Sequence, residues 1–205
     1  MFDNLSSPFQ VKEFTLPYPN QVSKESIVHR AAELIEEAGV DALSLSKLAA
    51  ALGVKAPSLY RHIGNKNQLL QEVNLLTLQN LFATLQQAIE QANGDPQIQM
   101  KALCVAYRQF AHRHAQLYLL AYTHKAEGLR PDEDLLVEMI MPIQLLMVQI
   151  CGEVNALTAL RGALALMHGF VMLELNEQLQ RGGDLELAYT QSFAAYLRGW
   201  STSSF

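Results

Sequence analysis

The most informative part of the sequence is residues 44–66, which read SLSKLAAALGVKAPSLYRHIGNK. Two short segments with helical apolar spacing, at about 45–52 and 57–63, flank Gly53, which can adopt the positive φ of a tight turn. Ala49 is small where the two helices would cross, and Val54 and Leu59 would supply the apolar contacts between them. This spacing predicts a helix-turn-helix, whose second helix enters the major groove of DNA.

Charge is distributed unevenly along the chain. The net charge of −5 over 205 residues argues against a nucleic-acid coat protein or a strongly basic membrane binder. Residues 42–71 nevertheless contain no carboxylate, and their cations are Lys47, Lys55, Arg61 and Lys66. A cationic face joined to an acidic body favours phosphate binding at one end only. The alternative is a charged face that meets only water.

The remaining sequence indicates a globular, all-helical chain. Hydrophobic residues make up 50% and charged residues 17%, which excludes a disordered protein. No alternating strand pattern stands out, and glycines and prolines fall where helices would begin or end. We expect further helices near residues 24–38, 66–92, 96–113, 116–124, 132–151, 156–181 and 185–200. The predicted N-caps are Asp95, Asn155 and Asp184.

The compartment is predicted from cysteine usage and from segments that the sequence lacks. Cys104 and Cys151 are too few for a disulfide framework and have no metal-binding spacing. Residues 1–20 do not resemble a secretory signal, and no apolar run reaches the roughly 18 residues of a membrane span. We therefore expect a soluble cytoplasmic protein that uses no metal or other cofactor and no membrane.

The stretch from Gly53 to Ile63, followed by Asn65 and Lys66, resembles the signature of the tetracycline-repressor (TetR/AcrR) family of bacterial transcription regulators. The resemblance is specific over about residues 24–72. It implies an all-α homodimer, with a three-helix DNA-binding domain followed by a larger helical domain for ligand binding and dimerisation. We accordingly expect an extended arm at 1–22, a helix-turn-helix domain at 23–68 and a ligand-binding and dimerisation domain at 69–205.

The resemblance also implies which residues meet DNA. Tyr60 and His62 would hydrogen-bond phosphates, and Lys66 would add positive charge at the start of the long helix. The other expected contacts come from Ser44, Ser46, Lys47, Lys55, Ala56, Pro57, Ser58 and Arg61. The alternatives are a core aromatic at Tyr60, a surface histidine at His62 and an ordinary helix-start lysine at Lys66.

Two positions depart from the family pattern. Ser46 stands where many members carry an arginine that reads a base, and Ala56 offers at most a methyl contact to thymine. Base reading would then fall mainly on Arg61, Lys55 and Ser58, which changes the expected operator sequence but not the docking mode.

The last two helices carry apolar residues on more than one side, which predicts a four-helix dimer interface. The expected interface residues are Leu160, Gly162, Leu164, Ala165, Gly169, Val171, Tyr189, Phe193, Tyr196 and Trp200. An ordinary monomer core is the alternative.

The middle helices are expected to surround a ligand cavity, mainly because the resemblance implies a ligand-binding domain. Its predicted lining is Leu103, Tyr107, Phe110, Tyr118, Tyr122, Met139, Ile143, Met147, His168 and Met172. For His168, the alternative is a hydrogen-bonded core histidine.

Three functions compete at this point. The first is a repressor released from a palindromic double-stranded DNA operator by a small hydrophobic ligand. The second is a DNA-binding protein of the same fold whose body binds another protein and senses no small molecule. The third, a helical enzyme, is disfavoured because the sequence has no nucleophile elbow, phosphate-binding loop, zinc motif or paired carboxylates in a plausible pocket.

Overall fold

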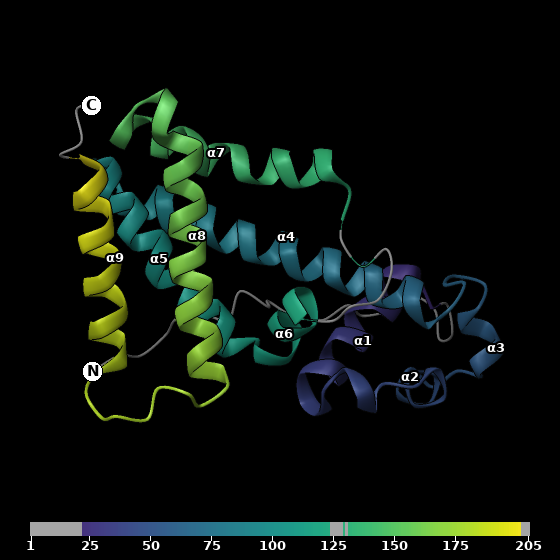
Figure 1. Ribbon diagram of the computed structural model, residues 1–205. Coiled ribbons are helices and arrows are strands. Elements are labelled where there is room, and N and C mark those ends of the chain that lie inside the picture. The colour runs from purple at the N-terminus through teal and green to yellow at the C-terminus, as the bar shows by residue number, and fades with distance from the viewer. Residues whose placement is uncertain (1–21, 124–128, 130, 202–205) are drawn as a thin grey trace. The chain divides into compact units, whose positions relative to one another are not determined.

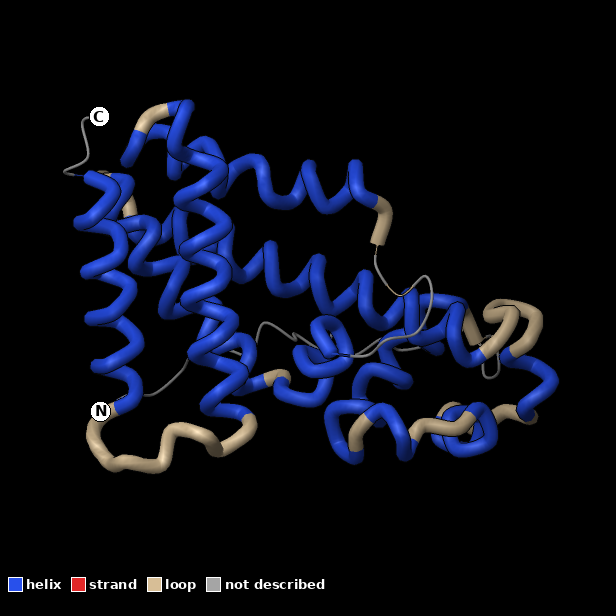
Figure 2. Tube along the Cα trace, viewed as in Figure 1, coloured by secondary structure: helices blue, strands red, loops and turns tan. Residues whose placement is uncertain are grey.

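The structure is a computed structural model that describes residues 22–123, 129 and 131–201. Within those ranges every regular element is a helix and none is a strand (Figures 1 and 2), so the all-helical prediction is confirmed. The predicted arm at 1–22 lies outside the described residues except for Val22. The chain divides into two compact units, Met1–Val73 and Asn74–Phe205.

The first unit holds the predicted helix-turn-helix. Its elements are α1 (Lys24–Ala38), the 3-10 helix η1 (Val40–Ala42), α2 (Leu45–Ala51), α3 (Ala56–Leu59) and the first turns of α4 (Lys66–Ala92). Ile27 from α1, Leu48 from α2 and Leu59 from α3 are completely buried. Of the two side chains predicted to join the short helices, Leu59 therefore belongs to the core of this unit, whereas Val54 is only half-buried.

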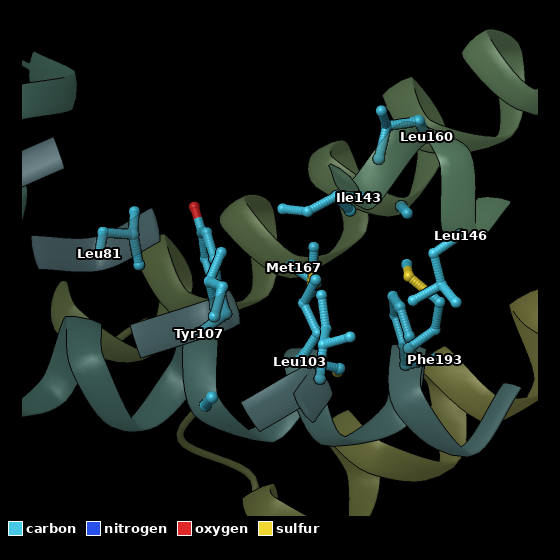
Figure 3. Close-up of a cluster of buried hydrophobic side chains, with 14 of the residues drawn as sticks. Leu81, Leu103, Tyr107, Ile143, Leu146, Leu160, Met167 and Phe193 are labelled. Carbon is cyan, nitrogen blue, oxygen red and sulfur yellow. The ribbon is translucent and has the colours of Figure 1, made fainter. Parts of the chain in front are cut away.

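The second unit is a bundle of long helices. It contains the rest of α4 together with α5 (Pro96–Arg113), α6 (Ala115–Thr123), α7 (Glu133–Cys151), α8 (Glu153–Leu175) and α9 (Leu185–Ser201). Helices α7 and α8 pack along each other, and α5 packs against α7, α8 and α9. Figure 3 shows the apolar core that these helices enclose, with Leu103 and Tyr107 of α5 close to Met167 of α8 and Phe193 of α9.

Two of the three predicted N-caps are confirmed. The side chains of Asp95 and Asp184 accept backbone N–H groups of the first turns of α5 and α9, at 2.7 and 2.9 Å. Asn155 is not a cap, because Gly152 takes φ 77° and α8 begins directly after it. The helix also ends earlier than predicted, at Leu175.

One further local prediction needs correction. The second helix of the motif, expected at about 57–63, ends at Leu59, and a turn in which the N–H groups of residues 62 and 63 share the carbonyl of Leu59 completes the segment. Helix α7 continues through Pro142 as one element, although a proline inside a helix removes one backbone hydrogen bond.

Helices α7 and α8 have long apolar sequences. Within the described part of the chain, these two are long and apolar enough to cross a membrane by length and composition alone. The expectation that no apolar segment reaches membrane-span length was therefore wrong, because isolated charges such as Arg161 and Glu174 hardly lower the average hydropathy. A core helix of a globular domain passes the same test. Much of the apolar surface of α7 is exposed, so it is open to contact with another molecule.

Candidate nucleic-acid interface

The turn between α2 and α3 is built by the residues that predicted it. The Ser44 hydroxyl caps α2 by accepting the backbone N–H of Lys47 at 3.2 Å. Gly53 adopts φ 67°, and the N–H of Val54 then donates to the carbonyl of Ala49 at 2.9 Å. The turn thus fixes where α3 begins, with Lys55 as the residue before its first turn.

The side chains predicted to meet DNA are largely on the surface of the first unit. Tyr60 is 55% exposed, which excludes the alternative of a core aromatic. Lys55 and Arg61 are exposed, and neither side chain makes an ion pair or hydrogen bond with another described residue. The further exposed members of the predicted set are Ser44, Ser46, Lys47, Pro57 and His62, whereas Ala56, Ser58 and Lys66 are half-buried.

Two of the four cations have partners within this unit. The Lys66 ammonium group donates to the carbonyl of Leu43 at 2.7 Å, in a partly buried position. Lys47 donates to the carbonyl of Ala42 at 3.1 Å, in an exposed position. The sequence alone gave no sign of either bond, because a lysine can reach several backbone carbonyls and nothing in the spacing selects one.

The predicted ligand-pocket residues form a packed cluster that contains a polar chain. Leu103, Tyr107, Phe110, Tyr118, Ile143 and Met147 are buried, His168, Met139 and Met172 are half-buried, and Tyr122 is exposed. The hydroxyl groups of Tyr107 and Tyr118 are 2.8 Å apart, and the second lies 2.6 Å from Nδ1 of His168. Burial raises the pKa of both phenols and lowers that of His168, so all three groups remain neutral near pH 7.

Two surface hollows in the second unit lie away from this cluster. One has a volume of about 310 Å³ and is lined by Lys101, Cys104 and Val105 of α5 and by Thr190, Gln191, Phe193 and Ala194 of α9. The other, of about 380 Å³, is lined by Glu174, Glu177, Leu179, Gln180 and Leu185. Leu103 and Tyr107 of the predicted lining are close in sequence to the α5 residues that line the first hollow, but neither of them borders it.

The predicted dimer interface needs correction at several positions. Leu160, Val171, Tyr189 and Phe193 are buried in the core of the single chain, so they cannot cover a partner. Gly162 lies against the Tyr196 hydroxyl of the same chain, and Trp200 packs on that core. The prediction failed there because periodicity shows that a helix face is apolar, not which neighbour covers it. Leu164 and Ala165 remain exposed, and Gly169 is half-buried.

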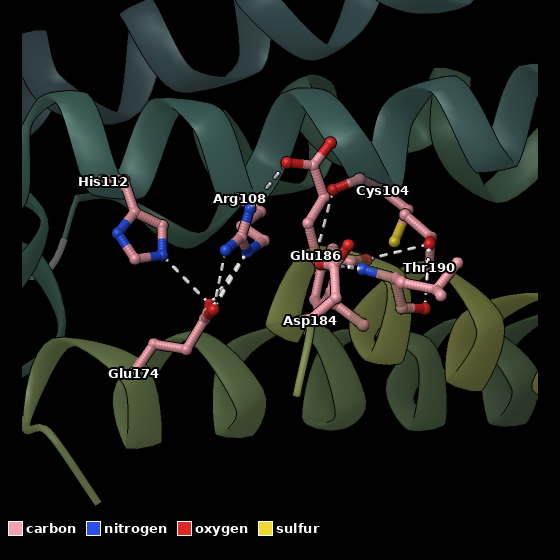
Figure 4. A network of polar contacts seen from close by, with 9 residues as sticks. Cys104, Arg108, His112, Glu174, Asp184, Glu186 and Thr190 are labelled. Carbon is pink, nitrogen blue, oxygen red and sulfur yellow. Dashed lines mark hydrogen bonds and ion pairs between the residues drawn. The ribbon is translucent and has the colours of Figure 1, made fainter. Parts of the chain in front are cut away.

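An ion pair with a buried carboxylate in the second unit was missed entirely. Arg108 of α5 binds the carboxylate of Glu174 of α8 through Nε and Nη2, at distances from 2.8 to 3.1 Å (Figure 4). His112 Nε2 lies 3.0 Å from the same carboxylate, whose side chain is only 3% exposed. These residues are more than sixty positions apart in sequence, so no local pattern could have paired them.

No cluster of three or more His, Cys, Asp or Glu side chains that could hold a metal occurs among residues 22–123, 129 and 131–201. The two cysteines are not bonded to each other. The helix-turn-helix with its exposed cations, followed by a helical second unit, is the architecture of a DNA-binding regulator.

Comparison with known proteins identifies the family. Residues 27–73 match the family described as "Bacterial regulatory proteins, tetR family", and residues 100–197 match the "Tetracyclin repressor-like, C-terminal domain". The chain belongs to the TetR family of transcriptional regulators, and it is a DNA-binding regulator rather than an enzyme.

Individual known proteins resemble the chain in sequence or in fold. The chain is 28% identical over 183 residues to the uncharacterized HTH-type transcriptional regulator YobS of Bacillus subtilis (strain 168), covering 87% of this chain and 92% of that protein. A structure from Rhodococcus sp. RHA1, described as a protein with unknown function, superimposes with a TM-score of 0.74 at 26% identity, over 91% and 100% of the two chains. A TetR variant from Acinetobacter baumannii AYE, solved with minocycline, has a TM-score of 0.61 at 22% identity, over 87% and 96%.

Proposed function

We propose that the protein is a homodimeric repressor that binds a palindromic operator in the cytoplasm and is released by a small hydrophobic ligand. The observation that carries the proposal is the surface of the helix-turn-helix. Lys55, Tyr60 and Arg61 project from it, and no carboxylate occurs between residues 42 and 71. A surface of this kind pairs with phosphates and base edges, since a nearby carboxylate would repel both the backbone and the acceptor-rich groove.

The proposed roles of these residues at DNA differ. Arg61 is the best candidate to read a base, since its guanidinium group can donate two hydrogen bonds to guanine. Lys55 and Ser58 supply further donors near the start of the same short helix. Tyr60, His62, Ser44, Ser46 and Lys47 meet the backbone, whereas Ala56 and Pro57 contribute apolar contact.

A dimer is required because one short helix reads too few bases for a specific site. Two recognition helices must lie roughly 34–36 Å apart to meet successive major grooves. We assign the interface to the outer faces of α8 and α9, where Leu157, Leu164 and Ala165 of α8 and Ala195 of α9 are exposed. Leucines beside small residues allow two helix pairs to approach closely and to bury apolar surface.

The ligand site is proposed at the chain of Tyr107, Tyr118 and His168. Neutral hydroxyl and imidazole groups surrounded by apolar side chains suit a mostly apolar molecule with one or two hydrogen-bonding groups. The Acinetobacter relative was solved with a small molecule, which supports this kind of response in the fold. A ligand that prefers a different spacing of the two recognition helices would lower operator affinity. The coupling free energy between two such binding sites is typically about 1–3 kcal/mol.

The decisive experiment is selection of bound duplexes from a random DNA pool by the purified protein. A consensus with two-fold symmetry supports DNA binding by the helix-turn-helix, the dimer and the class of function together. An asymmetric consensus would refute the symmetric dimer, and the absence of any enrichment would refute operator binding. The control is the Arg61→Ala, Lys55→Ala double variant, which should enrich no consensus.

A second function is favoured by the outer face of α7. Val137, Met141 and Leu145 repeat every four residues and are all exposed, so they form one apolar stripe. Such a stripe suits docking of another protein in place of sensing a small molecule. A thermal-shift screen with hydrophobic metabolites separates the two functions. Stabilisation that disappears in a Tyr118→Phe, His168→Gln variant supports the ligand, whereas no stabilisation by any metabolite supports the protein partner.

A further inference from the structure

Lys66 is the first residue of α4, and its side chain is engaged inside the protein. Its ammonium group donates a hydrogen bond of 2.7 Å to the carbonyl oxygen of Leu43, twenty-three residues earlier. The bond is partly buried. It therefore connects the start of α4, the longest helix in the part of the chain that the structure describes, to the loop just before α2.

Helix electrostatics explain why this lysine needs an acceptor. The N-terminus of α4 carries a partial positive charge, which disfavours a cation in the first turn. No carboxylate lies in the first turn to neutralise it. The Leu43 carbonyl supplies negative partial charge, and the Leu43 side chain is itself only 3% exposed, which holds that carbonyl in place.

The loop that Lys66 binds sets the start of the DNA-facing motif. Leu43 directly precedes Ser44, the N-cap of α2. The Leu43 N–H also donates to the carbonyl of Val40 at 3.2 Å, so the residue links η1 to α2. Movement of Leu43 would displace Ser44 and with it the exposed end of α2.

Lys47 provides the contrast within the same loop. It binds the adjacent carbonyl, that of Ala42, but at 3.1 Å and in an exposed position. Water or a phosphate can replace such a bond at little cost. The Lys66 bond is shorter and partly buried, so breaking it leaves a carbonyl without its partner in a place that water reaches less easily.

We propose that Lys66 is a positioning residue of the DNA interface, which ties α4 to the loop before α2, and that it does not itself bind a phosphate. The inference rests on the proposed orientation of α2 and α3 toward DNA. It replaces the direct role in charge that the family resemblance implies for this lysine.

The first test compares Lys66→Met, Lys66→Arg and Lys55→Met on a random-sequence 30-bp duplex at a series of KCl concentrations. Loss of one phosphate contact lowers the slope of log affinity against log salt by about 0.9. Lys66→Met should weaken binding without changing the slope and should lower the melting temperature by roughly 2–4 °C. Lys66→Arg should restore both properties at least in part. Lys55→Met should lower the slope and leave the melting temperature unchanged.

The outcomes that overturn the proposal are distinct from failure of the proposed function. A Lys66→Met protein with a reduced slope and an unchanged melting temperature identifies a phosphate contact, and one that matches wild type in both excludes a positioning role. Wild-type protein that binds no duplex refutes DNA binding itself. In that case the melting temperatures of the two Lys66 variants still test the bond.

The second test uses wild-type protein, so it does not depend on folding of a variant. Lysine acetylation by a small N-hydroxysuccinimide ester is followed by mass spectrometry, with and without the same duplex. Lys66 should react slowly in the free protein and no more slowly with DNA. Lys55 should react quickly and become protected by DNA. Fast reaction of Lys66 in the free protein, followed by protection with DNA, contradicts the proposal.

Discussion

The hydroxyl of Tyr196 in α9 donates a hydrogen bond of 2.6 Å to the carbonyl oxygen of Ala159 in α8. The contact brings the phenol ring against Gly162, where a Cβ atom would lie 2.3 Å from the hydroxyl oxygen. The glycine therefore permits close packing of two helices within one chain, a role that its spacing with other small residues did not distinguish from contact with a partner.

Replacing this glycine should destabilise the second unit. Gly162→Ala forces the Tyr196 ring to move, and overpacking of this kind costs about 1–3 kcal/mol of unfolding free energy. Gly169→Ala is the matched control on the same helix, because a Cβ there meets no atom within 4 Å. The control should be neutral or more stable by up to about 1 kcal/mol. Urea denaturation measures both, and equal stability of the two variants would contradict the packing role.

The buried carboxylate of Glu174 should make stability depend on pH. Burial alone would raise its pKa, but hydrogen bonds from Arg108 and His112 outweigh burial and hold the pKa below its ordinary value. The stabilisation is therefore present above the pKa of an unfolded glutamate and is lost as the pH falls through the folded value. We expect Glu174→Gln to lose about 1.5–3 kcal/mol at pH 7.

Denaturation from pH 7 into acid checks this expectation, because the gap between Glu174→Gln and wild type should close as the carboxylate of wild type is protonated. Glu186→Gln is the control. Its carboxylate lies 3.8 Å from Arg108 but its side chain is 69% exposed, so its loss should have little effect. A gap for Glu174→Gln that stays constant with pH would rule out the charged pair as its source.

Arg61→Ala should relax the sequence preference at one base position. If the guanidinium group reads guanine, its loss costs about 1–3 kcal/mol on the selected operator and little on a duplex changed at that position. Titration of wild type and variant against both duplexes gives the difference. An equal loss on every duplex would make Arg61 a phosphate contact.

The dimer interface can be tested with one charge on α8. Leu164→Arg places a cation on the proposed interface and should give a monomer in size-exclusion chromatography with light scattering. Val154→Arg is the control, since Val154 is 93% exposed at the start of the same helix. Loss of the dimer in both variants, or in neither, would place the interface elsewhere.

The two cysteines should differ in reactivity. Burial raises the pKa of Cys104 to about 12, although a hydrogen bond with Tyr189 partly opposes the rise. Cys151 is only half-buried, and burial raises its pKa less strongly. Because the thiolate is the reactive form, iodoacetamide at pH 8 should modify Cys151 well before Cys104 in the folded protein. Peptide mass spectrometry after short exposure distinguishes them, and the difference should vanish in urea.

The sequence predicted those structural features that depend on residues close together in the chain. Caps such as Asp95 and the turn at Gly53 act within a few positions of the chain, so they could be recognised without a structure. The residues predicted to meet DNA came from the family resemblance of one short window, and their contact with DNA stays a prediction. Partners across the bundle could not be recognised, and Tyr189 shows why, because an apolar residue on a helix face packs equally well against its own chain or another one.

The bond between Lys66 and Leu43 gives a cation a partner that brings no opposite charge. A carbonyl oxygen offers a dipole and no net charge, so the ammonium group stays positively charged while it is bound. Because the bond is partly buried, salt screens it less than it screens a cation on the open surface. The local structure before α2 should therefore persist at salt concentrations that already weaken the attraction between exposed lysines and a phosphate backbone.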